Sequence, residues 1–318
     1  MKFKQRKVVV IGAGVVGTTY IYALLQHGLA TEIALVDIDR QRLEGEVMDL
    51  SHGLPFIAPV EIHAGSYDDC SDANLIVITA GAKQTSGQSR IELVQKNAEI
   101  IKTICKKIKS SHSRAVIVVV TNPVDVLTQL AIQQLKWPRQ RIIGSGTVLD
   151  SSRFKYLLSR HCGVDARNVH AYVLGEHGDS EVAAWSMTHI AGVPVRKYCP
   201  VCRKCAYEKC HKDIAEKVRD SAYHIIDYKG STYYGIGLSL VRISEAILRN
   251  ENSVLTVSVL LQGEYGLRDV CLSVPCVIDA NGVQKIIDAP LNKAELKALE
   301  KSAGTLTEIF RSIKIRGS

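Results

Sequence analysis

The chain has no apolar run long enough to cross a membrane, no low-complexity stretch and no repeated period of about 20 to 50 residues. Its basic start, Met1 to Lys7, is similar to the charged end of a signal peptide. The apolar run that follows, Val8 to Ile11, is only four residues long, which is too short for secretion. We therefore expect a cytoplasmic protein that makes no contact with a membrane.

The chain also lacks an evenly spaced cysteine framework and a basic arm. Its nine cysteines fall at irregular intervals, so reduced thiols are the default. Forty Lys and Arg residues against 32 Asp and Glu residues give a formal charge of +8, but they are spread along the chain without interleaved aromatics. This pattern disfavours nucleic-acid binding and suits small anionic ligands.

The first half of the sequence alternates short β-branched runs with segments of helical periodicity. Near-continuous Val and Ile runs are typical of a parallel sheet covered on both faces. The alternation predicts an α/β, doubly wound parallel-sheet (Rossmann) domain over residues 1–145. The expected strands are Lys7–Ile11, Glu32–Val36, Leu75–Thr79, Ala115–Val120 and Arg141–Ile143, and the expected helices are Val16–Gln26, Arg42–Leu50, Ile91–Ile108 and Val124–Leu135.

The second half does not alternate in this way, which predicts an α+β domain over residues 146–318. With 318 residues, 46% of them hydrophobic, the chain is long enough for two domains. The expected elements are a helix at Val148–Arg160, a strand at Val169–Leu174, a helical region at Asp213–Asn250 interrupted near Gly230, strands at Ser253–Gln262 and Val270–Ile278, a turn at Asn281-Gly282, and a last helix from the Asn292 cap region through Phe310.

A glycine-rich turn follows the first expected strand directly. Gly12 permits a tight turn, Gly14 lets a pyrophosphate approach the backbone, and Gly17 lets the helix pack closely on the strand. The N–H groups that begin the helix then face the phosphates. Asp37 stands 20 residues beyond Gly17, where a carboxylate can accept hydrogen bonds from both ribose hydroxyls and repel a 2′-phosphate. The turn therefore predicts NAD rather than NADP as the cofactor.

A histidine next to a glycine, His177 in Leu-Gly-Glu-His-Gly-Asp-Ser, is the leading candidate for acid–base chemistry. Its ordinary pKa lies near neutrality, so it can donate and accept a proton at working pH. Asp150 and Arg153 are three residues apart at the start of an expected helix and share a face. Asp150 can accept the proton of one imidazole nitrogen, and Arg153 can hold a substrate carboxylate. The alternative for these two residues is a surface ion pair.

Two polar segments follow strands of the first domain. Residues 81–90 form a small glycine-bearing loop without core residues, so the loop can move and carry Arg90 at its far end onto a substrate. Residues 121–125, Thr-Asn-Pro-Val-Asp, end another strand at the same carboxyl edge, where ligands bind in open sheets.

These motifs resemble the lactate/malate dehydrogenase family, and within it the bacterial L-lactate dehydrogenases. The resemblance covers essentially the whole chain. It is carried by residues 12–17 (Gly-Ala-Gly-Val-Val-Gly), 49–53 (Asp-Leu-Ser-His-Gly), 121–125, 146–150 (Gly-Thr-Val-Leu-Asp), 175–179 (Gly-Glu-His-Gly-Asp) and 232–236 (Thr-Tyr-Tyr-Gly-Ile).

The resemblance implies a homotetrameric enzyme of glycolysis and fermentation that interconverts pyruvate and L-lactate with NAD. It implies that His177 is the general acid for ketone reduction and Asp150 its partner, and that Arg90, delivered by loop closure, polarises the carbonyl. Asn122 is implied to bind the reacting oxygen. The implied substrate-binding residues are Gln84, Arg90, Asn122, Arg153 and Thr232, and the implied cofactor-binding residues are Gly12, Gly14, Val16, Gly17, Asp37, Asn122, Ser145 and Ile236.

Gln84 occupies the position that selects the substrate. In malate dehydrogenases of the family an arginine there pairs with a second carboxylate, so a neutral glutamine favours pyruvate over oxaloacetate. The alternatives are a dehydrogenase of malate or of a bulkier 2-hydroxy acid, and a non-catalytic NAD-binding structural or sensor protein. A protein without catalysis has no physical reason to keep His177, Asp150, Arg153 and Arg90 together.

The chain departs from the family pattern at two places. Thr85-Ser86 replaces the usual Lys-Pro after the glutamine, which changes the stiffness of the loop and removes no catalytic group. In allosteric bacterial members an arginine and a histidine bind fructose 1,6-bisphosphate at a subunit interface. Lys155 and His170 stand at those positions here, so the charge is kept and the bidentate fork is lost.

A cysteine cluster at residues 199–211 has a spacing that can bind zinc or an iron–sulfur cluster. Four thiols and an imidazole lie within 13 residues, at Cys199, Cys202, Cys205, Cys210 and His211. The family has no metal in this variable region. We therefore favour a solvent-exposed loop of reduced cysteines and no bound metal.

Overall fold

The structure, a computed structural model, describes residues 6–82, 89–202 and 207–313, and its centre is a nine-stranded sheet in the order β14-β13-β12-β6-β5-β4-β1-β2-β3. The six strands from β6 to β3 are all parallel. Their bounds are β1 Lys7–Ile11, β2 Glu32–Val36, β3 Glu61–Ala64, β4 Leu75–Ile78, β5 Val116–Val119 and β6 Ile142–Gly144. The chain order reverses between β1 and β4, which is where doubly wound sheets bind ligands.

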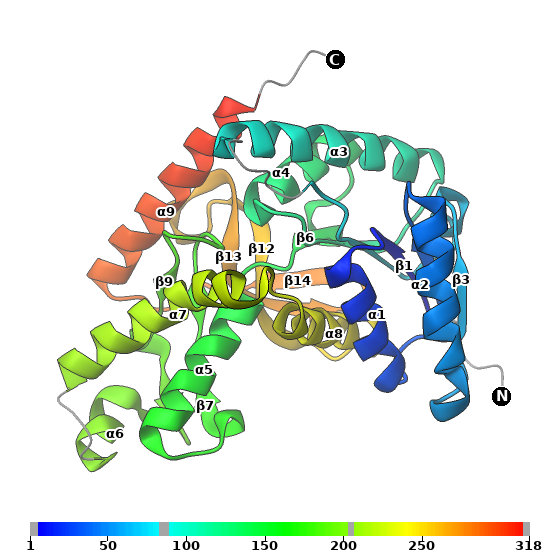
Figure 1. Cartoon of the computed structure of the whole chain (residues 1–318). Coiled ribbons are helices and arrows are strands. Elements are labelled where there is room, and N and C mark those ends of the chain that lie inside the picture. The colour runs from blue at the N-terminus through cyan, green and yellow to red at the C-terminus, as the bar shows by residue number, and fades with distance from the viewer. Residues whose placement is uncertain (1–5, 83–88, 203–206, 314–318) are drawn as a thin grey trace.

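Helices cover both faces of this sheet, as the Val and Ile runs predicted. Figure 1 shows α3 and α4 on one side and α1 and α8 on the other. Every residue of β1, β4 and β5 is buried, which explains the apolar runs. The helices are α1 Val15–Gln26, α2 Arg40–His52, α3 Arg90–Ser110, α4 Val124–Leu135 and, from the second half, α8 Tyr234–Leu248, which packs on α1. The expected Rossmann domain is confirmed.

The second half of the chain extends the same sheet. The antiparallel strands β12 (Ser253–Gln262), β13 (Arg268–Asp279) and β14 (Gly282–Ile286) join the parallel strands where Ser258 pairs with Gly144. In Figure 1, α6 (Val195–Cys202), the start of α7 (Tyr207–Lys229) and the far end of α5 (Val148–Cys162) form a lobe away from the sheet. Helix α9 (Lys293–Ser312) packs against β13. The sheet is therefore shared by both halves of the chain.

Several sequence predictions for the second half were wrong in detail. The single strand expected at Val169–Leu174 corresponds to two strands, β7 Val169–His170 and β8 Val173–Leu174. These lie in different sheets, because β7 pairs with β10 (His189–Ile190) whereas β8 pairs with β9 (Val182–Ala183). The helical region expected at Asp213–Asn250 is interrupted near Gly230 as predicted, since α7 ends at Lys229 and α8 begins at Tyr234, but it begins earlier, at Tyr207. Strand β3, helix α6 and three short strands were not predicted; these short strands are β9, β10 and β11 (Val193–Pro194).

Candidate active site

The glycine-rich turn lies between β1 and α1 with no room for side chains at two of its three glycines. Gly12 has φ +118°, and a Cβ there would lie 2.5 Å from the Ala80 nitrogen. A Cβ on Gly17 would lie 2.1 Å from the Gly12 carbonyl oxygen. A Cβ on Gly14 would meet no atom within 4 Å. Gly14 therefore borders open space at the start of α1, where a phosphate group can approach the backbone.

The carboxylate of Asp37 is held against this turn at the carboxyl end of β2. It accepts hydrogen bonds from the backbone N–H of Ala13 at 2.6 Å and of Asp39 at 2.9 Å. Gly14 caps α1 and no side chain caps that helix. An uncapped helix start beside an anchored carboxylate fits the pyrophosphate and ribose of a dinucleotide.

His177, Asp150 and Arg153 form one connected chain of contacts. The Nδ1 atom of His177 lies 2.5 Å from Asp150 Oδ2, and the Nη1 atom of Arg153 lies 2.5 Å from Asp150 Oδ1. Asp150 is 1% exposed, so the pair with Arg153 is a buried one and the surface alternative is wrong. An ionised carboxylate only accepts, so Nδ1 carries a proton and Nε2 is left for a substrate.

The pKa values of the side chains at this site are shifted by burial and by neighbouring charges. The Asp150 carboxylate raises the pKa of His177 to about 9, against the opposing effect of burial. Burial opposes ionisation of Asp150, but the charges of His177 and Arg153 outweigh it and lower the pKa of that carboxyl. Burial, with the Asp150 charge, raises the pKa of the neighbouring Glu181 carboxyl to about 8. At neutral pH the site therefore holds a protonated imidazole and a neutral Glu181.

The loop that carries His177 is fixed by elements far away in the sequence. Gly175 exchanges two backbone hydrogen bonds of 2.9 Å with Ser273 on β13. The Glu176 N–H donates to Ser302 Oγ of α9 at 2.8 Å, and the His177 N–H donates to Asp125 Oδ2 of α4 at 2.8 Å. No sequence motif predicted a role for Ser302, and none assigned a specific role to Asp125. The one sequence signal for Asp125 was its position at the start of an expected helix, within the motif at residues 121–125.

A buried amide connects the loops that follow β4 and β5. The Asn97 side chain on α3 accepts from the Ala82 N–H at 2.8 Å and donates to the Asn122 carbonyl oxygen at 2.9 Å. Sequence reasoning missed Asn97, which no motif marks. Gln84, with Thr85 and Ser86, lies outside the described residues.

The remaining predicted ligand-binding residues lie on separate elements. Arg90 is the first residue of α3, directly after the Ser89 cap. Ser145 is buried directly after β6, and Val16 and Ile236 lie partly buried on α1 and α8. Thr232 lies on the segment between α7 and α8. The packing of α8 against α1 and α5 brings these elements together around the carboxyl edge of the sheet.

Lys155 and His170, the two positions predicted for an effector, differ in their exposure. Lys155 is partly buried on α5, with its Nζ 5.5 Å from the centre of the Tyr172 ring. Burial, with the charge of Arg242, lowers the pKa of Lys155. His170 is exposed on β7. The charge of Arg242 near Lys155 was not predictable from sequence spacing, because the two residues are far apart in the chain.

The expectation of a solvent-exposed cysteine loop is wrong for Cys199. Its side chain is fully buried on α6, with the sulfur 3.9 Å from His161 Nε2 of α5. Cys205 and the side chains of Cys202 and Cys210 lie outside what the structure describes. Within the described residues, one group of three potential metal ligands lies close together, Glu32, His63 and Asp69. The Lys7 ammonium already bonds both carboxylates, at 2.9 and 3.0 Å. The absence of a metal stays a prediction.

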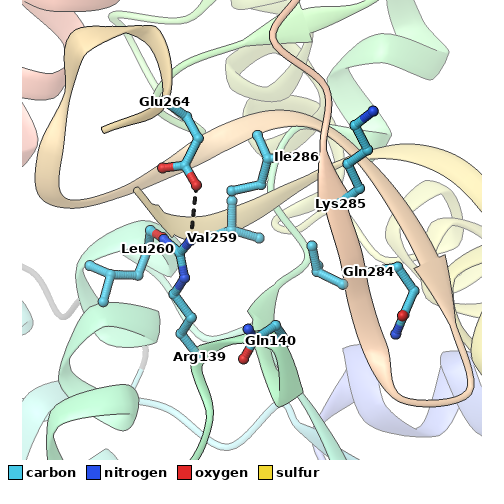
Figure 2. A pocket seen from close by; sticks show the side chains of 9 residues that line it. Arg139, Gln140, Val259, Leu260, Glu264, Gln284, Lys285 and Ile286 are labelled. Atoms are coloured by element: carbon cyan, nitrogen blue, oxygen red, sulfur yellow. Dashed lines mark hydrogen bonds and ion pairs between the residues drawn. The ribbon is translucent and has the colours of Figure 1, made fainter. Parts of the chain in front are cut away.

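A cavity of about 280 Å³ lies at the other end of the sheet, between the short helix η3 (Arg139–Arg141) and the strands β12 and β14. Figure 2 shows the Arg139 guanidinium paired with Glu264 across it, at 2.9 Å. The η3 helix precedes β6, so this cavity borders the amino edge of the parallel strands. It is separate from the carboxyl edge that carries His177.

The dinucleotide turn and the buried acid–base pair together define an NAD-dependent oxidoreductase, and comparisons with known proteins agree. Residues 6–144 match the NAD binding domain of lactate/malate dehydrogenase, and residues 147–315 match its alpha/beta C-terminal domain. The chain therefore belongs to the lactate/malate dehydrogenase family, and NAD is its cofactor. In the described part of the chain, no helix combines the length and apolarity that a membrane span needs.

Similar proteins match along nearly the whole chain. It is 51% identical over 310 residues to an L-lactate dehydrogenase of Acetivibrio thermocellus, covering 98% of both chains. It is 54% identical over 312 residues to one of Treponema denticola, covering 98% of this chain and 99% of the relative. The ligand-bound crystal structure of the minor L-lactate dehydrogenase of Enterococcus mundtii superposes with a TM-score of 0.95 at 42% identity, covering 98% of this chain and 99% of that chain.

Proposed function

We propose that this enzyme reduces pyruvate to L-lactate and, in reverse, oxidises L-lactate to pyruvate, in the glycolytic and fermentative metabolism of the cytoplasm. The observation that carries the proposal is the buried chain of contacts from His177 through Asp150 to Arg153. A protonated imidazole near a guanidinium supports the proposal, because a 2-oxo acid carries a ketone that needs a proton and a carboxylate that a guanidinium can bind.

The chemistry divides among the residues as follows. NADH supplies the hydride when it is bound. His177 donates the Nε2 proton to the ketone oxygen, and Asp150 stabilises the imidazolium and orients the ring. Arg153 grips the substrate carboxylate, while Arg90 stabilises the charge that develops on the oxygen. Asn122 holds that oxygen and Thr232 lines the pocket.

The test of this proposal is a panel of 2-oxo acids, with NADH consumption as the readout. We expect the highest kcat/KM with pyruvate and lower values with oxaloacetate and branched 2-oxo acids. Gln84→Arg should raise activity on oxaloacetate and lower it on pyruvate, since a guanidinium in a closed pocket needs a carboxylate partner. A charged contact of this kind should change the ratio by at least about tenfold, or about 1.4 kcal/mol. An unchanged ratio would place Gln84 outside the pocket.

We also propose a homo-oligomer, with a tetramer as the expected state. A hollow of about 710 Å³ between α1 and the end of α2 is bordered by apolar side chains that are exposed in the single chain. Tyr22 is 60% exposed and Phe56 is 88% exposed. Covering such a surface with a second copy removes apolar area from water. Sedimentation at several concentrations measures the assembly, and a strict monomer would contradict it.

Fructose 1,6-bisphosphate is the proposed effector, with Lys155 and His170 as its ligands. The support is the position of these two basic residues on neighbouring elements, α5 and β7, which pack together. Doubled by a two-fold axis, the two residues would present two lysine and two histidine side chains to the two phosphates.

A further inference from the structure

Asp125 is a buried carboxylate that the proposed reaction does not use. It is the second residue of α4 and is 1% exposed. Its Oδ2 atom accepts the backbone N–H of His177 at 2.8 Å, across 52 residues of sequence. A buried carboxylate costs free energy unless something compensates it, so its retention in the core calls for a physical reason.

Two features favour the charged form of this carboxylate. The start of a helix has a positive partial charge, and Asp125 lies in the first turn of α4. The His177 N–H and the neighbouring Ser258 hydroxyl of β12 both lower its pKa. Burial is the larger effect, and it raises the pKa of Asp125 to about 6. The carboxylate is thus ionised at neutral pH and protonated in mild acid.

The charge of Asp125 also acts on the imidazole. It raises the pKa of His177, as Asp150 does more strongly, while the Arg153 charge lowers it. The other titratable groups near these two residues are Glu176 on the same loop, Cys271 on β13 and Glu181.

We propose that Asp125 is a positioning residue for the acid–base step: it holds the main chain of His177 against α4 and supplies a second buried negative charge to the imidazolium. The proposal rests on the proposed function for the role of His177. Asp150 bonds the ring, and Asp125 bonds the backbone of the same residue. The loop that carries His177 is thereby held by a residue of α4 and a residue of α5, and these two helices lie in the two different domains.

The test is the protonation of His177 in the resting enzyme, followed by NMR of histidine-labelled protein without substrate. Asp125→Asn keeps an oxygen that can accept the His177 N–H but removes the charge. We expect it to lower the pKa of His177 by about half a unit or more. The kcat/KM profile for pyruvate reduction should shift to lower pH by the same amount.

Ser302→Ala is the matched control, because Ser302 accepts the adjacent Glu176 N–H and carries no charge. It should leave the pKa of His177 unchanged. An unchanged pKa in a folded Asp125→Asn protein would overturn the proposal, and so would an equal shift in both variants. Failure of the wild type to reduce pyruvate would instead refute the proposed function, since the NMR readout does not depend on activity.

A second variant covers the case in which Asp125→Asn does not fold. In the wild type, the His177 resonance should show a small step near pH 6, where Asp125 titrates. Ser258→Ala removes the hydroxyl that favours the ionised form, so the step should move to higher pH. A wild-type titration without this step, or a step that Ser258→Ala leaves in place, would overturn the proposal.

Discussion

Asp150→Asn tests the electrostatics of the acid–base pair directly. The carboxylate lies 2.5 Å from His177 Nδ1 and is the largest cause that raises the histidine pKa from 6.5 to about 9. At 1.36 kcal/mol per pKa unit, that interval corresponds to about 3 kcal/mol of preference for the imidazolium. Burial works in the opposite direction, so the pair interaction is at least this large.

The amide that Asp150→Asn introduces would keep the shape of the side chain and lose its charge. We therefore expect the pKa of His177 to fall by at least one unit, or about 1.4 kcal/mol, with Asp125 still contributing. Pyruvate reduction needs the protonated imidazole, so its kcat/KM falls as pH rises through this pKa. In the variant that fall should begin at lower pH, whereas lactate oxidation, which needs the neutral ring, should extend to lower pH.

The assay is kcat/KM against pH in both directions, because this parameter reports the pKa values of the free enzyme. Asp165→Asn is the control: this exposed carboxylate pairs with Arg167 and does not contact the site. Its profile should match the wild type. A folded Asp150→Asn enzyme with the wild-type profile would refute the assignment of Asp150 as the counter-charge, and so would a profile displaced to higher pH.

The glycine-rich turn, the two arginines and the effector site each give a further test. Gly17→Ala should lower the free energy of unfolding by about 1–3 kcal/mol, because its Cβ would lie 2.1 Å from a carbonyl oxygen. Gly14→Ala should leave the melting temperature near that of the wild type and should weaken NADH binding. Equal losses of thermal stability in the two variants would contradict this expectation. Arg153→Lys keeps the charge and loses the fork, so it should mainly raise the KM for pyruvate, whereas Arg90→Gln should mainly lower kcat; steady-state kinetics with the reverse pattern would exchange the two roles. Fructose 1,6-bisphosphate should lower the KM for pyruvate, and more strongly in mild acid. Lys155→Gln should abolish this effect, and Lys155→Arg should strengthen it. If millimolar fructose 1,6-bisphosphate leaves the KM for pyruvate unchanged, the site is not allosteric.

The elements that depend on local pattern could be predicted from the amino-acid sequence alone. The Val and Ile runs of β1, β4 and β5 are buried along their whole length, so their apolar character was visible without the fold. The glycine-rich turn was predictable because its glycine spacing directly follows an apolar strand and opens a helix, which is a local sequence pattern. The spacing of Asp150 and Arg153 placed them on one helix face, where they do pair.

Which segments meet, and how deeply they are buried, depends on contacts between residues that are far apart in the sequence. Residues 169–174 are apolar enough for one strand, but pairing with two different partners divides them into β7 and β8. The position of β12 beside β6, and of Asp125 beneath His177, depends on contacts across more than 50 residues of sequence. The periodicity of a sequence shows which residues are neighbours within one helical turn or one strand. The pKa values at the site depend on burial and on the distances between charges, and both are set only when segments that are distant in the sequence pack together.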